Sequence, residues 1–313
     1  MKPDFKHVPI MLNECITGLN IKENGIYVDA TLGGGGHSSE IAARLGKNGR
    51  LIGIDRDTDA LSAASARLQG NVCKMDFIHS NYSEIKNILN ELDVECVDGI
   101  LADLGVSSYQ LDNPERGFSY RFDAPLDMRM NREDKLTAYD VVNGYEFEKI
   151  FRIIKDYGEE KFAHQIAKNI VKRRMDKPIE TTFELVDIIN SSMPKKIALK
   201  GPHKAKRTFQ AIRIEVNREL ELLKNSVEDF LSVLGSGGRL AVITFHSLED
   251  RIVKNVFKDY TVGCICPKEL PVCVCNNKPK GKLITHKPLT AGEDEVFENN
   301  RSTSAKLRII EKI

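Results

Sequence analysis

The chain has 313 residues, a length that allows about two domains and a sizeable core without disulfides or metals. Its 46 Lys and Arg balance 45 Asp and Glu, for a formal charge of +1, which excludes a histone-like or acidic-tail protein but not a local basic patch. Hydrophobic residues at 41% and charged residues at 29% are ordinary for a globular protein and exclude global disorder.

The chain shows no membrane or secretion signal. No uncharged apolar stretch approaches the roughly 18 residues that a membrane helix needs. The first residues are interrupted by charge and contain no signal-peptide core. We therefore expect a cytoplasmic protein with reduced cysteines, no membrane contact and no obligate protein partner.

Strand and helix patterns alternate through the first hundred residues. Apolar runs predict strands, and helices with Gly or Asn turns separate them; the first helix has Ser38 or Ser39 as its expected N-cap. The expected strands are 25–30, 50–55, 72–79 and 97–103, and the helices are 38–45, 58–68 and 83–92. This alternation predicts right-handed βαβ units and a parallel sheet, hence an α/β fold.

The alternation stops after Asp103 and resumes with a strand at 238–245, after a turn at 235–238. The intervening segment is far longer than an ordinary crossover, and its sequence pattern predicts helices. We predict an α-helical domain, 113–212, inserted into an α/β domain made of 1–112 and 213–313. The remaining expected elements are helices 146–157, 160–174, 182–192, 213–234 and 248–259, and a last strand at 305–310.

A glycine run, Gly33 to Gly36, followed by His37, stands between the first strand and its helix. Glycines here let the backbone approach a ligand, and Asp55 closes the next strand where a carboxylate would take ribose hydroxyls. The spacing fails the last position of a dinucleotide fingerprint, since Ser38 stands there. Acidic strand ends at Asp29, Asp55 and Asp103 suit the sulfonium cation of S-adenosylmethionine, so a methyltransferase leads and a nicotinamide dehydrogenase is the alternative.

Seven collinear motifs closely resemble the bacterial 16S ribosomal RNA (cytosine-N4)-methyltransferases, the RsmH or MraW family. The resemblance covers nearly the whole chain. The motifs are His7–Glu14, Asp29–His37, Asp103–Ser108, Glu115–Ser119, Pro125–Met130, Arg207–Arg213 and Phe245–Arg251.

The resemblance implies a Rossmann-like class I S-adenosylmethionine methyltransferase sheet with an inserted helical substrate-recognition domain. The substrate it implies is a cytidine in the decoding region of 16S rRNA, nucleotide 1402, within the small ribosomal subunit. A non-catalytic RNA-binding protein is a further alternative. By the family's motifs, the residues expected to bind the methyl donor are Gly35, Gly36, His37, Asp55, Tyr82, Asp103 and Gln110.

Asp103 is also the candidate catalytic residue. N4 of cytosine is a poor nucleophile, so an acceptor on its N–H groups would orient it and stabilise developing charge. Asp103-Leu-Gly-Val106 supplies the acid but lacks the prolines and aromatic of other amine-methylating motifs, so binding the donor or capping the strand are alternatives. His246 is a weaker substrate-side candidate, and Ser247 to Asp250 form a predicted capping box.

Two segments suggest RNA contact. Residues 195–213 carry seven basic residues and no acid, from which we expect Lys204, Lys206 and Arg207 to contact phosphates. The loop 116–122 alternates aromatic and basic residues, so Arg116 and Phe118 are expected to stack on or contact RNA. Phe209 lies on a buried helical stripe and is expected in the core.

Four of the seven cysteines crowd into a Cys-x-Cys-x6-Cys-x-Cys segment. Four thiolates can hold zinc, but the spacing is tighter than the usual Cys-x2-Cys knuckle, and an unliganded loop is the alternative. The candidate ligands are Cys264, Cys266, Cys273 and Cys275.

Overall fold

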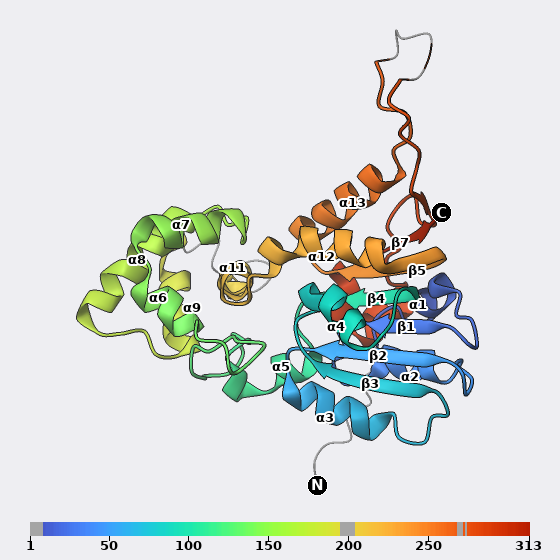
Figure 1. Cartoon of the computed structure of the whole chain (residues 1–313). Coiled ribbons are helices and arrows are strands. Elements are labelled where there is room, and N and C mark those ends of the chain that lie inside the picture. The colour runs from blue at the N-terminus through green and yellow to red at the C-terminus, as the bar shows by residue number, and fades with distance from the viewer. Residues whose placement is uncertain (1–8, 195–203, 268–271, 273) are drawn as a thin grey trace. The chain divides into compact units, whose positions relative to one another are not determined.

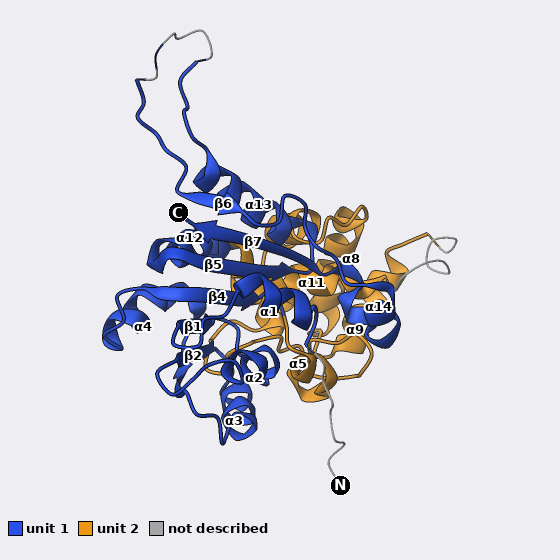
Figure 2. Cartoon of the chain, turned by 90° about the vertical axis from the view of Figure 1, so that its right-hand side faces the viewer, with its two compact units in different colours: residues 1–105, 221–313 blue, residues 106–220 orange. Residues whose placement is uncertain are grey.

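A computed structural model describes residues 9–194, 204–267, 272 and 274–313. The chain divides into two units, coloured blue and orange in Figure 2. Unit 1 comprises residues 1–105 and 221–313, and unit 2 comprises residues 106–220. The boundaries that we predicted from the sequence, 112/113 and 212/213, both fall inside unit 2.

Unit 1 is built on a seven-stranded sheet of order β3-β2-β1-β4-β5-β7-β6, in which the first five strands are parallel, β7 is antiparallel to β5, and β6 is antiparallel to β7. This confirms the predicted α/β class (Figure 1). The strands are β1 (Ile26–Asp29), β2 (Arg50–Asp55), β3 (Lys74–His79), β4 (Val97–Asp103), β5 (Leu234–Thr244), β6 (Gly281–Leu283) and β7 (Lys306–Lys312).

The central strands are apolar on both faces because helices cover them. Val28, Ile52 and Ile100 are fully buried, and α1 and α2 share a core cluster with Leu101 and Ile243. The helices of unit 1 are α1 (Leu12–Leu19), α2 (Gly36–Ala42), α3 (Thr58–Arg67), η1 (Tyr82–Glu84), α4 (Ile85–Glu91), α12 (Glu219–Val233, which begins in unit 2), α13 (Ser247–Thr261), α14 (Glu293–Glu298) and η3 (Asn300–Ser304).

Three local predictions in unit 1 are corrected. Helix α2 begins at Gly36 with Gly35 as N-cap, because the Ser38 hydroxyl donates to Asp29 instead of capping. Strand β5 begins at Leu234, so the glycine segment predicted as a turn belongs to the strand; Gly237 is left-handed there, and the register shifts between Val97 and Gly99 of β4. The cap of α13 is His246, one residue before the predicted Ser247.

Unit 2 is helical, as the insert was predicted to be. Its core gathers apolar side chains from every long helix, among them Ile154, Ile166, Ile189 and Phe209. The elements are α5 (Ser108–Asp112), η2 (Pro114–Arg116), α6 (Ala138–Gly144), α7 (Phe147–Asp156), α8 (Ala163–Asp176), α9 (Thr182–Ser191) and α11 (Ala205–Asn217).

The single long helix predicted at 213–234 is two helices. α11 ends at Asn217, Arg218 takes a left-handed backbone conformation (φ 53°), and α12 follows. Asn217 is buried at 2% exposure; its Nδ2 donates to the Met128 carbonyl (2.8 Å), and its Oδ1 accepts from the Met130 N–H (2.8 Å). These bonds to a segment far away in sequence hold the break, and a helical pattern cannot show them.

No helix in the described part of the chain is long and apolar enough to cross a bilayer.

Candidate functional site

Three aspartates stand at the carboxyl ends of three adjacent parallel strands of unit 1. Asp29 ends β1, Asp55 ends β2 and Asp103 ends β4. β1 lies between β2 and β4, pairing Asp29 with Gly53 on one side and Leu101 on the other. The chain reverses its strand order between β1 and β4, and ligands of open α/β sheets bind beyond the strand ends at such a point.

The glycine loop joins β1 to α2 and leaves part of its backbone uncovered. Gly33 and Gly35 have positive φ (51° and 74°), which favours glycine. A side chain at Gly34 would meet nothing within 4 Å, whereas one at Gly35 would press on Ala64 and one at Gly36 would clash with Pro9. The open face therefore lies at Gly33 and Gly34, while the predicted Gly35 and Gly36 are packed against unit 1 itself.

Asp55 holds the glycine loop in place. Its Oδ2 accepts from the Gly33 N–H (2.7 Å), and its Oδ1 accepts from the Asp57 N–H (2.8 Å). Burial raises the pKa of the Asp55 carboxyl, and these N–H bonds lower it in part. If Asp55 also binds the ribose, as predicted, the same carboxylate would both order the glycine loop and bind the donor.

Asp29 has a structural role that the sequence did not predict, in addition to the negative charge that it did predict. It is 1% exposed, its Oδ2 accepts from the Ser38 hydroxyl (2.7 Å), and its Oδ1 from the Thr31 N–H (3.3 Å). Burial raises its pKa to about 6, and Asp55 adds to the rise. Asp29 thus fixes the start of α2.

Asp103 is the most perturbed acid of the three. Its side chain is 28% exposed, yet its Oδ1 is buried and has no hydrogen-bond partner among the described residues. Burial, followed by the charges of Asp29 and Glu249, raises its pKa to about 8. A buried unpaired carboxyl oxygen is costly and marks a candidate ligand or reaction site.

Two neighbours fix the position of Asp103. Its backbone N–H donates to Thr31 Oγ1 (2.6 Å), which ties the end of β4 to the glycine loop. His37 Nδ1 lies 4.0 Å from Asp103 Oδ2, while His37 Nε2 lies 3.0 Å from the Ile10 carbonyl oxygen. His37 is buried at 6% exposure, so it positions the loop and the segment before α1.

The other predicted donor contacts are distributed over both units. Tyr82 follows β3 in unit 1, and its ring lies 6.0 Å from that of Phe230 in α12. Gln110 belongs to unit 2, where its Oε1 accepts from the Ser107 N–H in a capping box of α5. Donor contact by either residue stays a prediction.

His246 has a structural role at the start of α13. Its Nδ1 accepts from the Glu249 N–H (3.4 Å), and Glu249 Oε2 accepts from the His246 N–H (3.3 Å), which completes a capping box. Its side chain is 8% exposed. His246 therefore caps α13, and a contact with the substrate stays a prediction.

The structure does not favour the predicted RNA contacts by Arg116 and Phe118. Both side chains are buried, at 1% and 5% exposure. Arg116 Nη2 donates to the carbonyls of Arg129 and Met130 (3.0 and 2.9 Å), and Phe118 belongs to the core of unit 2. Gly117 turns the chain between them with a left-handed φ of 67°.

The same loop exposes different members of its aromatic and basic pattern. Phe122 is 40% exposed and Arg121 is exposed. On α11, Lys206 and Arg207 are exposed, Lys204 is partly buried, and Phe209 is in the core as predicted, in edge contact with Tyr120. Lys195, Lys196 and Lys200 lie outside the described residues.

Three of the four clustered cysteines come together. The sulfur atoms of Cys264, Cys266 and Cys275 all lie within 4.8 Å of one another. Cys273 lies outside the described residues.

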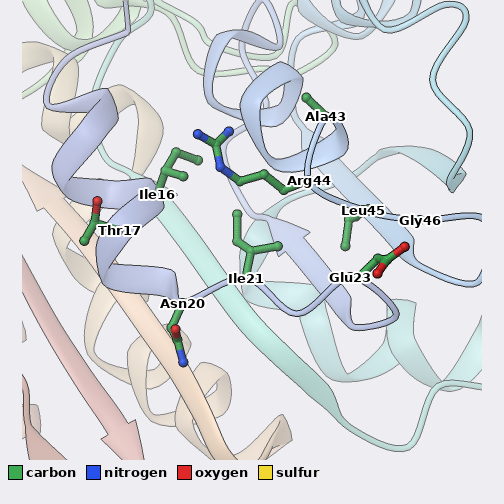
Figure 3. A pocket seen from close by; sticks show the side chains of 9 residues that line it. All are labelled: Ile16, Thr17, Asn20, Ile21, Glu23, Ala43, Arg44, Leu45 and Gly46. Carbon is green, nitrogen blue, oxygen red and sulfur yellow. The ribbon is translucent and has the colours of Figure 1, made fainter.

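A shallow pocket of about 670 Å³ lies elsewhere in unit 1. Figure 3 shows its lining, which includes Thr17, Asn20, Glu23 and Arg44. These residues precede β1 and follow α2, so the pocket belongs to the amino edge of the sheet and not to the edge that carries the three aspartates.

Residues 4–313 match the model of the MraW methylase family. "Ribosomal RNA small subunit methyltransferase H" of Clostridium botulinum (strain Kyoto / Type A2) is 56% identical, over 99% of this chain and 100% of the relative. The protein of the same name from Clostridioides difficile (strain 630) is 54% identical over the same shares. A solved rRNA methylase from Streptococcus thermophilus is 12% identical, covers 96% of this chain and 93% of its own, and has a TM-score of 0.41, too low to bear on fold or function.

Proposed function

The chain belongs to the MraW methylase family, and we propose that it transfers the methyl group of S-adenosylmethionine to N4 of a cytidine in the decoding region of 16S rRNA, nucleotide 1402. The observation that carries the proposal is identity of 56% across the whole length of a relative named for methylation of small-subunit rRNA. We further propose that it works in the cytoplasm, where its rRNA substrate is found.

The residues at the strand ends fit the methyl donor. S-adenosylmethionine supplies a methyl group on a cationic sulfur. A cation would favour the charged forms of the carboxyl groups of Asp29, Asp55 and Asp103, and Asp103 Oδ1 is buried without a partner in the described chain. The uncovered backbone of Gly33 and Gly34 leaves room for close approach. A nicotinamide dinucleotide fits less well, because its pyrophosphate would add negative charge to this acidic edge.

Asp103 is the residue that we propose for proton handling. A pKa of about 8 means that the Asp103 carboxyl group exchanges its proton near neutral pH. A cation nearby would favour the charged form, which can accept an N–H of the cytosine amine and orient its lone pair. The Thr31 hydroxyl accepts from the Asp103 backbone N–H and so fixes the end of β4 that carries this carboxyl group, and we propose that positioning supplies much of the rate.

Unit 2 supplies the proposed RNA contacts. Lys206 and Arg207 are exposed at the start of α11, and Phe122 is an exposed aromatic in the 116–122 loop. The cations suit phosphates and the ring suits a splayed base. Phe122 takes the stacking role that we first assigned to Phe118.

Nucleoside mass spectrometry tests the proposal. In 16S rRNA from a strain that lacks this gene, N4-methylcytidine derivatives should disappear, and expression of the wild-type chain should restore them. Another methylated nucleoside of the same digest serves as the internal control. Unchanged N4-methylcytidine derivatives would overturn the function. Calorimetry should find binding of S-adenosylmethionine and none of NAD; the reverse would favour the dehydrogenase.

A further inference from the structure

The segment that joins α13 to β6 carries three thiols that neither the fold nor the proposed methyl transfer uses. Figure 2 shows this segment running out from unit 1, away from the sheet. Cys264 is exposed, and Cys266 and Cys275 are partly buried. Ile265 and Val274, which alternate with the cysteines, are 67% and 72% exposed. The apolar side chains therefore supply no core that would hold the thiols together.

Hydrogen bonds close the base of the segment. Asn277 Nδ2 donates to the carbonyls of Val262 and Gly263 (3.1 and 2.7 Å), and the Lys280 N–H donates to the Tyr260 carbonyl (3.0 Å). These bonds pair the two arms just before Cys264 and just after Cys275. The backbone thus brings the thiols to one place independently of any bond between sulfur atoms.

The spacing of the sulfur atoms suits a tetrahedral metal. Cys264 Sγ and Cys275 Sγ are 3.7 Å apart, and Cys266 Sγ is within 4.8 Å of both. Zinc–sulfur bonds of about 2.3 Å in a tetrahedron place neighbouring sulfurs about 3.8 Å apart. A disulfide would need about 2.05 Å. The thiols are therefore arranged as ligands of a shared ion would be.

Backbone donors point at two of the sulfur atoms. The Ile265 N–H donates to Cys275 Sγ (3.3 Å), and the Val274 N–H donates to Cys266 Sγ (3.4 Å). Such bonds orient the sulfur atoms, as hydrogen bonds around a metal site orient its ligands. They run crosswise between the two Cys-x-Cys arms, so each arm orients a ligand of the other.

We propose that Cys264, Cys266 and Cys275 form a structural zinc site that fastens the end of this segment. Zinc displaces the thiol protons, and the three thiolates occupy three of its four positions. The ion serves the loop and not methyl transfer, because the aspartates at the strand ends belong to other elements.

Metal analysis of protein purified under reducing conditions without chelator tests the site. Wild-type protein should carry about one equivalent of zinc, and Co²⁺ should replace it with an intense thiolate-to-metal absorption band. Cys264→Ser and Cys275→Ser should each lose the zinc and the band. Cys96→Ser, which changes an exposed cysteine elsewhere in unit 1, should keep both.

Two further readings make the result decisive. Binding of S-adenosylhomocysteine should be the same in all variants, which shows that the loop mutants fold. Protease cleavage within residues 262–280 should be faster after chelation in wild type and unchanged by chelation in Cys264→Ser. Zinc-free wild-type protein that takes up Co²⁺ without the band would overturn the proposal, as would retention of zinc by both loop variants or a Cys264–Cys275 disulfide in its place.

Discussion

Asp103 keeps a carboxyl group where negative charge is unfavourable. At a pH below the ordinary pKa of an aspartate, near 4, the folded and unfolded chains both hold the Asp103 proton, so Asp103 does not make the free energy of unfolding depend on pH. As pH rises toward about 8, the unfolded chain releases the proton first and the folded chain retains it, so the free energy of unfolding falls. The limiting slope is about 1.4 kcal/mol per pH unit.

We predict that Asp103→Asn removes this slope. Relative to wild type, the variant should gain stability steadily from pH 5 to pH 8, because an amide has no proton to retain. Denaturant unfolding followed across that range measures the difference. Unfolding free energies that run parallel for the two proteins would show that Asp103 is ionised normally.

The same residue should couple donor binding to pH. A sulfonium near Asp103 favours the carboxylate, so binding of S-adenosylmethionine should release a proton. Its affinity should rise from pH 6 to pH 8 by up to about tenfold per unit relative to S-adenosylhomocysteine, which lacks the cation. Calorimetry of both ligands gives the ratio, and Asp103→Asn should make it independent of pH. A constant ratio in wild type would place the cation away from Asp103.

Asp55 should act through binding alone. Asp55→Ala removes the acceptor of the Gly33 N–H and the proposed ribose contact, so the donor dissociation constant should rise by the equivalent of about 1.5–3 kcal/mol. Because such a contact is equal in the ground and transition states, saturating donor should restore most single-turnover methylation. Donor titration with single-turnover assays measures both; a rate that stays low at saturation contradicts this role.

At the scale of elements, the break between α11 and α12 depends on one amide. Asn217→Ala would leave the Met128 carbonyl and the Met130 N–H unpaired inside unit 2, which should lower the free energy of unfolding by about 1–3 kcal/mol. Chemical denaturation measures the loss. Asn87→Ala, at an exposed asparagine whose side chain donates to the nearby Glu84 carboxylate, is the control and should change little. Equal stability of the two variants would mean that local helix propensity sets the break.

Elements with a local cause were predictable from the sequence. Strands β1 to β4 and helices α7 to α9 follow apolar periodicity and caps such as Thr181, whose hydroxyl accepts from the Glu184 N–H. The end of α11 and the start of β5 depend on partners distant in sequence, namely Met128 and Val97, and the Gly35 cap depends on the bond from Ser38 to Asp29 across the glycine loop. Periodicity within one segment carries no signal for such partners.

At the scale of the whole chain, the sequence located the acidic strand ends but not which side chains would be exposed. Asp29, Asp55 and Asp103 follow from strand endings, which parallel topology aligns at one edge. Arg116 and Phe118 shared the pattern of Arg121 and Phe122, and only the fold of unit 2 separates the buried pair from the exposed pair. That Asp103 Oδ1 has no hydrogen-bond partner among the described residues likewise depends on packing.

The division into units predicts that donor binding and RNA binding can be impaired separately. Lys206→Ala with Arg207→Ala removes two exposed cations from unit 2, so RNA binding should weaken and its salt slope should fall by up to about 1.4. Donor affinity should be unchanged. Asp55→Ala in unit 1 should weaken donor binding and leave RNA binding unchanged. Lys168→Ala with Lys172→Ala, two exposed cations of α8, is the matched control for lost charge.

Filter binding of a 16S rRNA fragment at several salt concentrations, together with donor calorimetry on all three variants, measures the effects. An unchanged salt slope in the α11 variant, or an equal fall in the α8 control, would remove α11 from the proposed RNA contact and leave general charge as the explanation.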